Sequence, residues 1–239
     1  MRVFLAGATG AIGRRLVPLL LRAGHDVIGT TRSAEKAREL ERAGVAAALL
    51  DVFDAQATRA AMRAAKPEAV IHQLTDLPRE FDGARITASY AANARIRSQG
   101  TRNLIAAAAA ASARRFIVQS IAFGYASGGE PHPETDPLNP SDPERAVTIK
   151  GAADMEHQVL GATSLDAIIL RYGFFYGPGT WHENPTRKPG LHIDAAAQAA
   201  CLALTRGAAG IYNIADDDGV VAIAKARAEI GFDPQFRLR

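Results

Sequence analysis

Cysteine is nearly absent from this sequence, since Cys201 is the only one in 239 residues. A single thiol excludes an internal disulfide and cannot build a zinc site, and the alanine-rich surroundings of Cys201 predict a buried thiol with a structural role. No apolar run reaches the roughly 18 residues that a membrane-spanning helix needs, and a strand pattern starts at once in place of a charged leader. We therefore expect a cytoplasmic protein that does not contact membranes.

An excess of charge is also missing, because the formal net charge is only +3. Many arginines are spread over helical patterns among acids and alanines, namely Arg59, Arg63, Arg95, Arg97 and Arg102. This spacing indicates solvated helix faces and argues against a nucleic-acid-binding surface. With 48% hydrophobic and 22% charged residues, the composition is that of a globular protein with one substantial core.

Strand patterns alternate with helix patterns along the chain. Strands are expected at residues 2–6, 26–30, 45–50, 68–72, 114–120, 165–171 and 210–215. Helices are expected at residues 11–23, 33–43, 54–65, in a long stretch to about 112, and at 143–160, 193–206 and 221–230. This alternation predicts an α/β fold, a Rossmann-like doubly wound parallel sheet. We expect a single domain over residues 1–239, to which residues 174–239 contribute a small, shortened C-terminal substrate lobe.

The segment "GATGAIG" joins the first expected strand to the first expected helix through Gly7, Gly10 and Gly13. Glycines at this place permit a tight turn and a close approach of the backbone to a pyrophosphate, and the helix N-terminus adds N–H groups and a positive dipole end. The strand, turn and helix context therefore predicts a dinucleotide site. The alternative is a glycine turn with a structural role only.

The second strand ends in "GTTRS" and carries no acid that could bind a free ribose 2′-hydroxyl. Arg32, with Thr31, Ser33 and Lys36 nearby, suits a 2′-phosphate and favours NADP over NAD, unless Arg32 only ends a strand in solvent. After the third strand, Asp51 and Val52 stand where an adenine ring would lie. Asp51 could equally be the N-terminal turn residue of the next helix.

Beyond the glycine loop, several segments share a pattern with one family: "VIHQLT", Asn93 followed by "GTRNLIAAA", "RRFIVQS", "LRYGFFYGPG", "HIDAAAQAA" and "GIYNIADD". The chain thus resembles an extended or atypical short-chain dehydrogenase/reductase of the NAD-dependent epimerase/dehydratase family. The resemblance implies that residues 73–75 line the ribose and nicotinamide and that residues 172–174 close over the nicotinamide. It also makes the helices near 86–112 and 143–160 plausible surfaces of a homodimer.

The cofactor-binding residues expected from the motifs and the resemblance together are Gly7, Thr9, Gly10, Ile12, Gly13, Thr31, Arg32, Asp51, Val52, Gln73, Leu74, Thr75, Asn93, Lys150, Tyr172, Gly173 and Phe174.

The catalytic machinery that the resemblance implies is incomplete. The family carries a Tyr-x-x-x-Lys pair after the fifth strand, and here the tyrosine position is Ala146 while Lys150 is retained. The family's serine is also displaced, because Ile121 takes its place and Ser120 lies one residue earlier. An alanine cannot move a proton. Lys150 is then expected to bond the nicotinamide ribose, the alternative being a solvent-exposed helix lysine.

Three functions are compatible with this pattern. The first is an NADP-dependent oxidoreductase acting on a small carbonyl or sugar-like metabolite, with Tyr125 as proton donor and Ser120 orienting the substrate oxygen; Tyr172 and Tyr176 are the other candidate donors. The second is an epimerase, dehydratase or isomerase that uses bound nicotinamide. The third is a cofactor-binding sensor without chemistry.

Few residues separate the "YGPG" turn from "HIDAAAQAA", where similar proteins carry a longer segment over the substrate. The short segment predicts an open cleft, a small substrate or a pocket completed by a partner chain. His182 and Glu183 are conceivable acid/base groups, but no metal-ligand spacing is present. His192 is expected to be a polar residue at a helix start, and His72 a structural one.

Overall fold

The computed structural model describes residues 1–78 and 80–238. Within these residues, seven parallel strands form one sheet in the order β3-β2-β1-β4-β5-β6-β9. The strands are β1 Arg2–Ala6, β2 Asp26–Thr31, β3 Ala46–Leu49, β4 Ala69–His72, β5 Arg115–Ile121, β6 Asp166–Tyr172 and β9 Gly210–Ile214. The strand order reverses direction between β1 and β4, as in a doubly wound sheet, so the predicted Rossmann-like α/β fold is confirmed.

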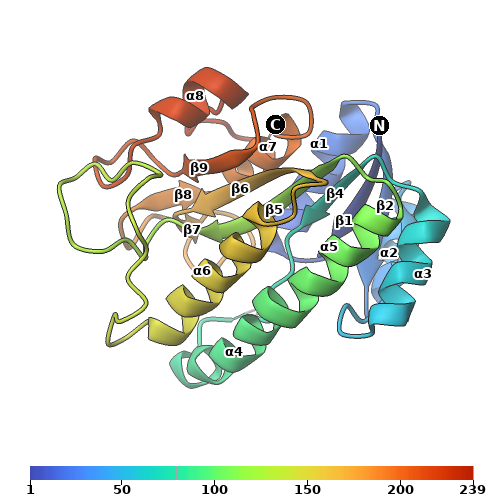
Figure 1. Ribbon diagram of the computed structural model, residues 1–239. Helices are drawn as coiled ribbons and strands as arrows, with labels where there is room; N and C mark the ends of the chain where they lie inside the picture. The colour runs from blue at the N-terminus through green and yellow to red at the C-terminus, as the bar shows by residue number, and fades with distance from the viewer. Residues whose placement is uncertain (79, 239) are drawn as a thin grey trace.

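Helices cover both faces of this sheet (Figure 1). They are α1 Ala11–Arg22, α2 Ala34–Arg42, α3 Ala55–Ala65, α4 Gly83–Arg95, α5 Thr101–Ala110, α6 Ala146–Leu160, α7 Ile193–Leu202 and α8 Ala224–Ile230. Helix α1 packs against α7 on one face, while α3 packs against α5, and α4 against α6, on the other.

Alternating side chains of β1 show how the sheet supports two hydrophobic layers. Val3 and Leu5 belong to the buried cluster that includes Leu16 of α1. Phe4 belongs to the opposite cluster, which includes Met62 of α3. Because successive strand residues point to opposite faces, a strand buried on both sides needs a continuous apolar sequence. "RVFLA" provides one, and the fold therefore follows from the sequence at this point.

The long helical stretch expected up to about residue 112 is confirmed, because helical backbone runs without a break from Gly83 to Ala110. The described residues between β4 and Gly83, 73–78 and 80–82, form no helix or strand, and the Asp82 carboxylate accepts hydrogen bonds from the amides of Ala84 and Arg85 at 3.0 and 3.2 Å. A π-helical turn at Ile96–Gly100 then separates α4 from α5. Such turns occur mainly at functional sites, and this one borders the cavity described below.

Helix α6 begins three residues later than expected, at Ala146. The Asp142 carboxylate does accept hydrogen bonds, from the Glu144 amide at 2.9 Å and the Arg145 amide at 2.7 Å. These bonds close a local turn, and Arg145 (φ −124°, ψ 8°) leaves helical geometry before α6 starts. The side chain of Arg145 therefore projects from the helix entrance.

A pair of short parallel strands, β7 Phe174–Tyr176 and β8 Gly190–His192, was not predicted from the sequence. It stands at the carboxyl edge of the main sheet, in the part of the chain expected to contribute the small substrate lobe. A Cβ at Gly173 would lie 2.6 Å from the Pro189 carbonyl oxygen, so glycine permits the close crossing between β6 and this pair. None of the described helices combines the length and the apolarity that crossing a membrane requires.

Candidate cofactor and active site

A cavity of about 1310 Å³ opens along the carboxyl edge of the sheet, at the reversal of strand order between β1 and β4. Open α/β sheets bind ligands at this place. The volume exceeds the roughly 300–1,000 Å³ of common small-molecule sites, which leaves room for a second ligand beside a cofactor. Of the predicted cofactor residues, all but Gly13 and Lys150 lie in the wall of this cavity.

The glycine loop forms one end of the cavity. Gly7 has φ +94°, and a Cβ there would lie 2.7 Å from the Gln73 carbonyl oxygen. A Cβ at Gly13 would lie 2.2 Å from the Gly7 carbonyl oxygen, so Gly13 lies beneath the loop and lets α1 pack against it. The first turn of α1, which follows Gly10, points its free N–H groups at this end of the cavity. The loop is thus shaped to receive a pyrophosphate.

Basic residues surround the adenosine end of the cavity. The guanidinium of Arg32 lies 3.4 Å from the Asp76 carboxylate, and both side chains are largely exposed. Ser33 is the N-cap of α2 and accepts a hydrogen bond from the Lys36 amide at 3.3 Å. The Thr31 hydroxyl accepts from the Ser33 amide at 3.2 Å and so supports the turn. At this end of the cavity, Arg32 and Lys36 are thus the side chains that can bind an anion.

Asp51 lies in the cavity wall, but its carboxylate accepts a hydrogen bond from the Phe53 amide at 3.0 Å. Its backbone carbonyl also accepts from the amide of Asp54, the N-cap of α3, so Asp51 forms the turn that leads into this helix. The buried Val52 contributes apolar surface beside it. The pair therefore forms a turn that an adenine ring can lie against.

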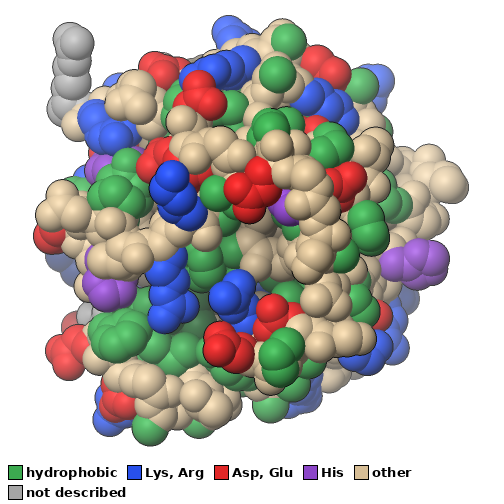
Figure 2. Space-filling model, turned by 90° about the vertical axis from the view of Figure 1, so that its left-hand side faces the viewer, with side chains coloured by type: hydrophobic (Ala, Val, Ile, Leu, Met, Phe, Trp, Pro, Cys, Tyr) green, Lys and Arg blue, Asp and Glu red, His purple; other side chains and the backbone are tan. Residues whose placement is uncertain are grey.

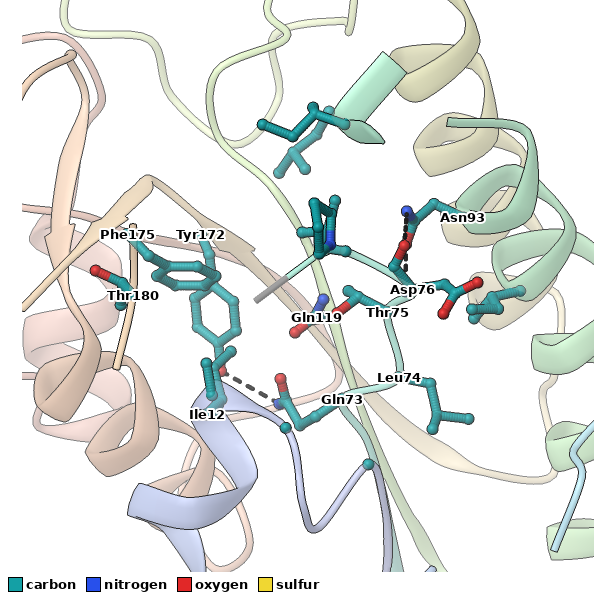
Figure 3. Close-up of a pocket in the computed structure, with 18 of the residues that line it drawn as sticks. Ile12, Gln73, Leu74, Thr75, Asp76, Asn93, Gln119, Tyr172, Phe175 and Thr180 are labelled. Carbon is teal, nitrogen blue, oxygen red and sulfur yellow. Dashed lines mark hydrogen bonds between the residues drawn. The ribbon is translucent and has the colours of Figure 1, made fainter. Parts of the chain in front are cut away.

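Gln73 places an unpartnered acceptor at the middle of the cavity (Figure 3). The Tyr172 hydroxyl donates its proton to the Ala196 carbonyl at 3.2 Å, so it accepts from Gln73 Nε2 at 3.4 Å. This arrangement fixes the amide and leaves Gln73 Oε1 buried without a hydrogen-bond partner among the described residues. A buried acceptor of this kind calls for a donor from a ligand. Together with the glycine cradle, it fits a dinucleotide.

Asn93 and His72 hold the loop after β4 in place. Asn93 accepts a hydrogen bond from the Asp76 amide at 3.0 Å and donates to the Ser89 carbonyl at 2.9 Å, as Figure 3 shows in part. His72 Nδ1 accepts from the Leu74 amide at 3.2 Å, and its other nitrogen meets Thr101 at 3.1 Å. Burial, followed by the charge of Arg97, lowers the pKa of His72 to about 3, so the ring is neutral and structural, as predicted.

Lys150 lies outside the cavity wall, so the structure does not bring it together with the other predicted cofactor residues. Its side chain is 68% exposed and pairs with Asp154 at 3.2 Å on the same helix. Ala146 does share this face, as the spacing predicts, but the face lies outside the cavity wall. Arg145 and Thr148 are the residues at the start of α6 that line the cavity, beside Glu144. No Tyr-x-x-x-Lys register faces the cofactor region.

Lys150→Ala is therefore expected to leave NADPH affinity unchanged within about twofold. The lost ion pair is exposed and lies one turn along a helix, so unfolding should become easier by no more than about 0.5 kcal/mol. Calorimetric titration and urea unfolding of the variant check both values. A tenfold loss of NADPH affinity in the variant would instead indicate that Lys150 bonds the nicotinamide ribose.

Ser120 and Tyr125 belong to a buried polar network, and of the two Ser120 lies in the cavity wall. The Ser120 hydroxyl donates to Glu156 at 2.5 Å. The Tyr125 hydroxyl donates to Asn213 at 2.6 Å, accepts from Arg171 at 2.9 Å and lies outside the cavity wall. Burial raises the pKa of Tyr125 further from neutrality. Both hydroxyls are committed to protein partners and hold β5, β6 and α6 together.

The two remaining tyrosines that the sequence offered as proton donors are engaged as well. Tyr172 lies in the cavity wall, but its proton is donated to the Ala196 carbonyl, and burial raises its pKa. Tyr176 lies outside the wall, beside Arg237 at 3.4 Å, and its pKa is raised by burial and by Asp216. Tyr125 and Tyr172 thus donate their protons to protein acceptors, and Tyr176 lies outside the cavity wall.

The distal half of the cavity, defined here as the part between α4, the β5–α6 loop and the β7–β8 pair, is aromatic. Phe123 and Phe174 stack with ring centres 4.1 Å apart. Phe81 meets Trp181 edge to face at 5.8 Å, and the Trp181 indole donates to the Pro78 carbonyl at 2.9 Å. Phe174 was predicted from the sequence, whereas Phe81, Phe123 and Trp181 were missed, because they come together only through the loops.

Other side chains place limits on the chemistry. His182 lies in the wall near Phe81, whereas His192 is the N-cap of α7, as expected. No group of three or more His, Cys, Asp or Glu side chains within the described residues could hold a metal ion. Cys201 is only partly buried, and burial raises the pKa of its thiol.

The family that matches this chain supports the same kind of ligand as the shape of the cavity does, a dinucleotide. A family described as NAD(P)H-binding matches residues 7–196. A 3-diazoavenalumate denitrifying reductase from a Streptomyces species is 39% identical over 240 residues, which cover 91% of this chain and 77% of that protein.

Solved structures with a similar fold include two UDP-glucose 4-epimerases. The enzyme from Thermotoga maritima has a TM-score of 0.82 and 17% identity, covering 99% of this chain and 94% of its own. The enzyme from Thermus thermophilus, in complex with NAD, has a TM-score of 0.78 and 22% identity, covering 100% of this chain and 95% of its own. At these identities the likeness concerns the fold, which is that of the NAD-dependent epimerase/dehydratase family.

Proposed function

Because this chain belongs to the NAD(P)H-binding family, we propose that it is an NADPH-dependent reductase that removes the nitrogen of a diazo-substituted aromatic carboxylate. The observation that carries this proposal is the start of α6. Arg145 and Thr148 line the cavity there, while Ala146, at the family's tyrosine position, and Lys150 lie outside its wall. A reductase that lacks the catalytic tyrosine and lysine needs a substrate whose reduction does not require a proton from the protein.

Carbonyl and diazonium groups differ in their demand for protons. Reduction of a carbonyl adds hydrogen to carbon and a proton to oxygen, so the active site needs an acid. When bound, NADPH supplies one hydride, and the balanced reaction Ar–N₂⁺ + NADPH → Ar–H + N₂ + NADP⁺ takes up no proton. The C–N bond breaks with its electron pair leaving in N₂, and the electron pair of the hydride forms the new C–H bond.

The residues of the cavity have two tasks in this reaction. The apolar side chains of Phe81, Phe174 and Trp181 shield the substrate from water, which would otherwise replace the diazonium group by a hydroxyl. Gln73, whose Nε2 donates to Tyr172 and so fixes the amide, accepts a hydrogen bond from the cofactor at its free Oε1 and fixes the cofactor's position over the substrate. The similarity to a reductase whose name specifies a diazo carboxylate and loss of nitrogen supports the same substrate class.

NADPH is proposed over NADH because of the charges at the end of β2. Arg32 lies in the cavity wall, where it forms an ion pair with the exposed Asp76. Lys36 lies in the first turn of α2. A guanidinium can meet a phosphate with two hydrogen bonds, and the N-terminus of α2 adds a favourable dipole.

Arg32→Ala should therefore weaken NADPH binding about 10- to 100-fold, the effect of losing a hydrogen-bonded charge, and change NADH binding by no more than about twofold. Arg38→Ala, which removes an exposed arginine on α2 that does not line the cavity, is the matched control. Calorimetric titration with both nucleotides makes the comparison. Tighter binding of NADH than of NADPH by the unmodified protein would defeat the NADP assignment.

Turnover of NADPH with three groups of compounds tests the reaction class. Aromatic diazonium carboxylates should oxidise NADPH, while simple ketones and UDP-sugars should not. Tyr90→Phe and His182→Gln, two ionisable side chains in the wall, should keep at least about a third of the rate, because no protein acid is needed. A hundredfold loss in either variant, the size of a general-acid effect, would contradict the proposal. Oxidation of NADPH by ketones would favour the carbonyl reductase expected from the sequence, and epimerised sugars the epimerase.

A further inference from the structure

The cations of the cavity fall into two groups. Arg14, Arg15, Arg32 and Lys36 line the end that is shaped for the cofactor's phosphates. Arg97, Arg145 and Arg187 line the distal half, where Glu144 is the acid in the wall. None of these three arginines forms an ion pair with a carboxylate of the described residues. The cofactor's phosphates account for the first group only.

Two of the distal arginines converge on one aromatic ring. The guanidinium carbon of Arg145 lies 5.9 Å from the ring centre of Phe174, and that of Arg187 lies 5.6 Å from the same ring. Arg145 comes from the entrance of α6 and Arg187 from the segment between β7 and β8, so separate elements bring them together. Figure 2 shows Lys and Arg side chains around a hollow with hydrophobic side chains at its base.

Arg145 is held in this position by the protein. Its Nη1 donates to the Phe123 carbonyl at 3.1 Å, and Phe123 is the residue that stacks on Phe174. The remaining N–H groups of the guanidinium have no acceptor among the described residues, and a planar fork of this kind suits a carboxylate. Arg97 differs, because its guanidinium donates to the Thr148 carbonyl at 2.8 Å and thereby supports α6.

The surfaces beside the two arginines suit a flat, apolar body. Phe81 is 57% exposed and Leu77 is 44% exposed, although both are large hydrophobic residues at the cavity wall. Exposed apolar groups gathered at one place indicate a ligand or partner site. With Trp181 and the Phe123–Phe174 stack, they offer aromatic contacts on more than one side of a conjugated ligand.

We propose that Arg145 and Arg187 bind the carboxylate of the substrate, while Phe174 and Phe123 pack against its conjugated body. This inference rests on the proposed function and names the residues that select the substrate. A carboxylate held at the distal arginines directs the other end of an elongated molecule toward Gln73 and Tyr172, in the middle of the cavity. The two arginines thereby select substrates that carry a negative charge and whose length places the reacting end in the middle of the cavity.

Trp181, the only tryptophan in the sequence, lies in the cavity wall and makes binding measurable without turnover. The protein loaded with NADP⁺ is titrated with trans-cinnamate and with trans-cinnamamide, its neutral counterpart, while tryptophan fluorescence is followed. Cinnamate should bind at least about tenfold more tightly than the amide, the effect of charged hydrogen bonds. Added sodium chloride should weaken binding of the acid more than binding of the amide.

Variants assign this preference to its residues. Arg145→Gln and Arg187→Gln should each reduce cinnamate affinity several-fold and leave the amide nearly unchanged, and the double variant should lose the preference. Lys188→Gln removes a charge from the same segment outside the cavity wall and should keep it. Equal affinity for acid and amide in the unmodified protein, or an intact preference in the double variant, would overturn the inference. A cinnamate preference without NADPH oxidation by diazonium compounds would sink only the proposed reaction.

Discussion

Gly13→Ala is expected to destabilise the protein by about 3 kcal/mol or more and to abolish measurable NADPH binding. An added Cβ would lie 2.2 Å from the Gly7 carbonyl oxygen and 2.6 Å from the Ala8 carbonyl group. All of these atoms are backbone, so they cannot turn aside as a flexible side chain would. Either α1 shifts away from the glycine loop or the loop opens, and both changes remove the cradle for the pyrophosphate. Urea unfolding and NADPH titration measure the two effects.

Two other glycines provide graded controls for this prediction. Gly83 opens α4 with an ordinary φ, and a Cβ added there would meet no atom within 4 Å, so Gly83→Ala should be neutral or slightly stabilising. Gly24 has equally open space but φ +76°, so Gly24→Ala should cost only the strain of that conformation, about 1–2 kcal/mol. A Gly13→Ala variant no less stable than Gly24→Ala, with normal NADPH affinity, would refute the close packing.

Glu156→Gln is expected to lower the free energy of unfolding by about 3–5 kcal/mol, because it leaves a buried arginine without its counter-ion. Arg171 reaches both oxygens of Glu156, with Nε–Oε1 at 2.9 Å and Nη2–Oε2 at 2.7 Å, and both side chains are buried. Burial alone would lower the pKa of Arg171, but the bonds and charge of Glu156 raise it above the ordinary value, so the guanidinium stays charged. Equilibrium unfolding in urea tests the loss.

The exposed pair between Lys150 and Asp154 is the matched control, and Asp154→Asn should cost no more than about 0.5 kcal/mol. The double variant Glu156→Leu with Arg171→Met removes both buried charges and should recover much of the stability lost in Glu156→Gln. A small effect of Glu156→Gln, similar to that of Asp154→Asn, would mean that this network does not hold β6 to α6.

The sheet and the glycine loop could be predicted from the sequence because local patterns determine them. Each main strand is a short apolar run, and Gly7 and Gly13 are required by close backbone contacts that follow from the strand, turn and helix order. The position of Arg32 follows from the same order, since it comes directly after β2. Its preference for NADPH stays a prediction.

The catalytic region could not be predicted in the same way, because its residues depend on helix register and on loops. The sequence pattern placed Ala146 and Lys150 at the family's catalytic positions, but α6 turns that face away from the cavity. Ser120 lies in β5 and Tyr125 follows it, yet their hydroxyls donate hydrogen bonds to Glu156 and Asn213, which come from distant parts of the chain. Similarly, Arg187 lies near Phe174 only because β7 and β8 pair. No hydrophobic periodicity in the sequence predicts this pairing.

The proposed reaction is tested most directly by following the nitrogen of the substrate. The protein is incubated with NADPH and a cinnamate that carries a diazonium group labelled with heavy nitrogen on its ring, and the gas and the aromatic product are analysed by mass spectrometry. We predict one labelled N₂, one cinnamate with hydrogen in place of the diazonium group and one NADP⁺ for each substrate consumed. Retention of the label in an aromatic hydrazine, or formation of a phenol without oxidation of NADPH, would contradict the proposed reaction.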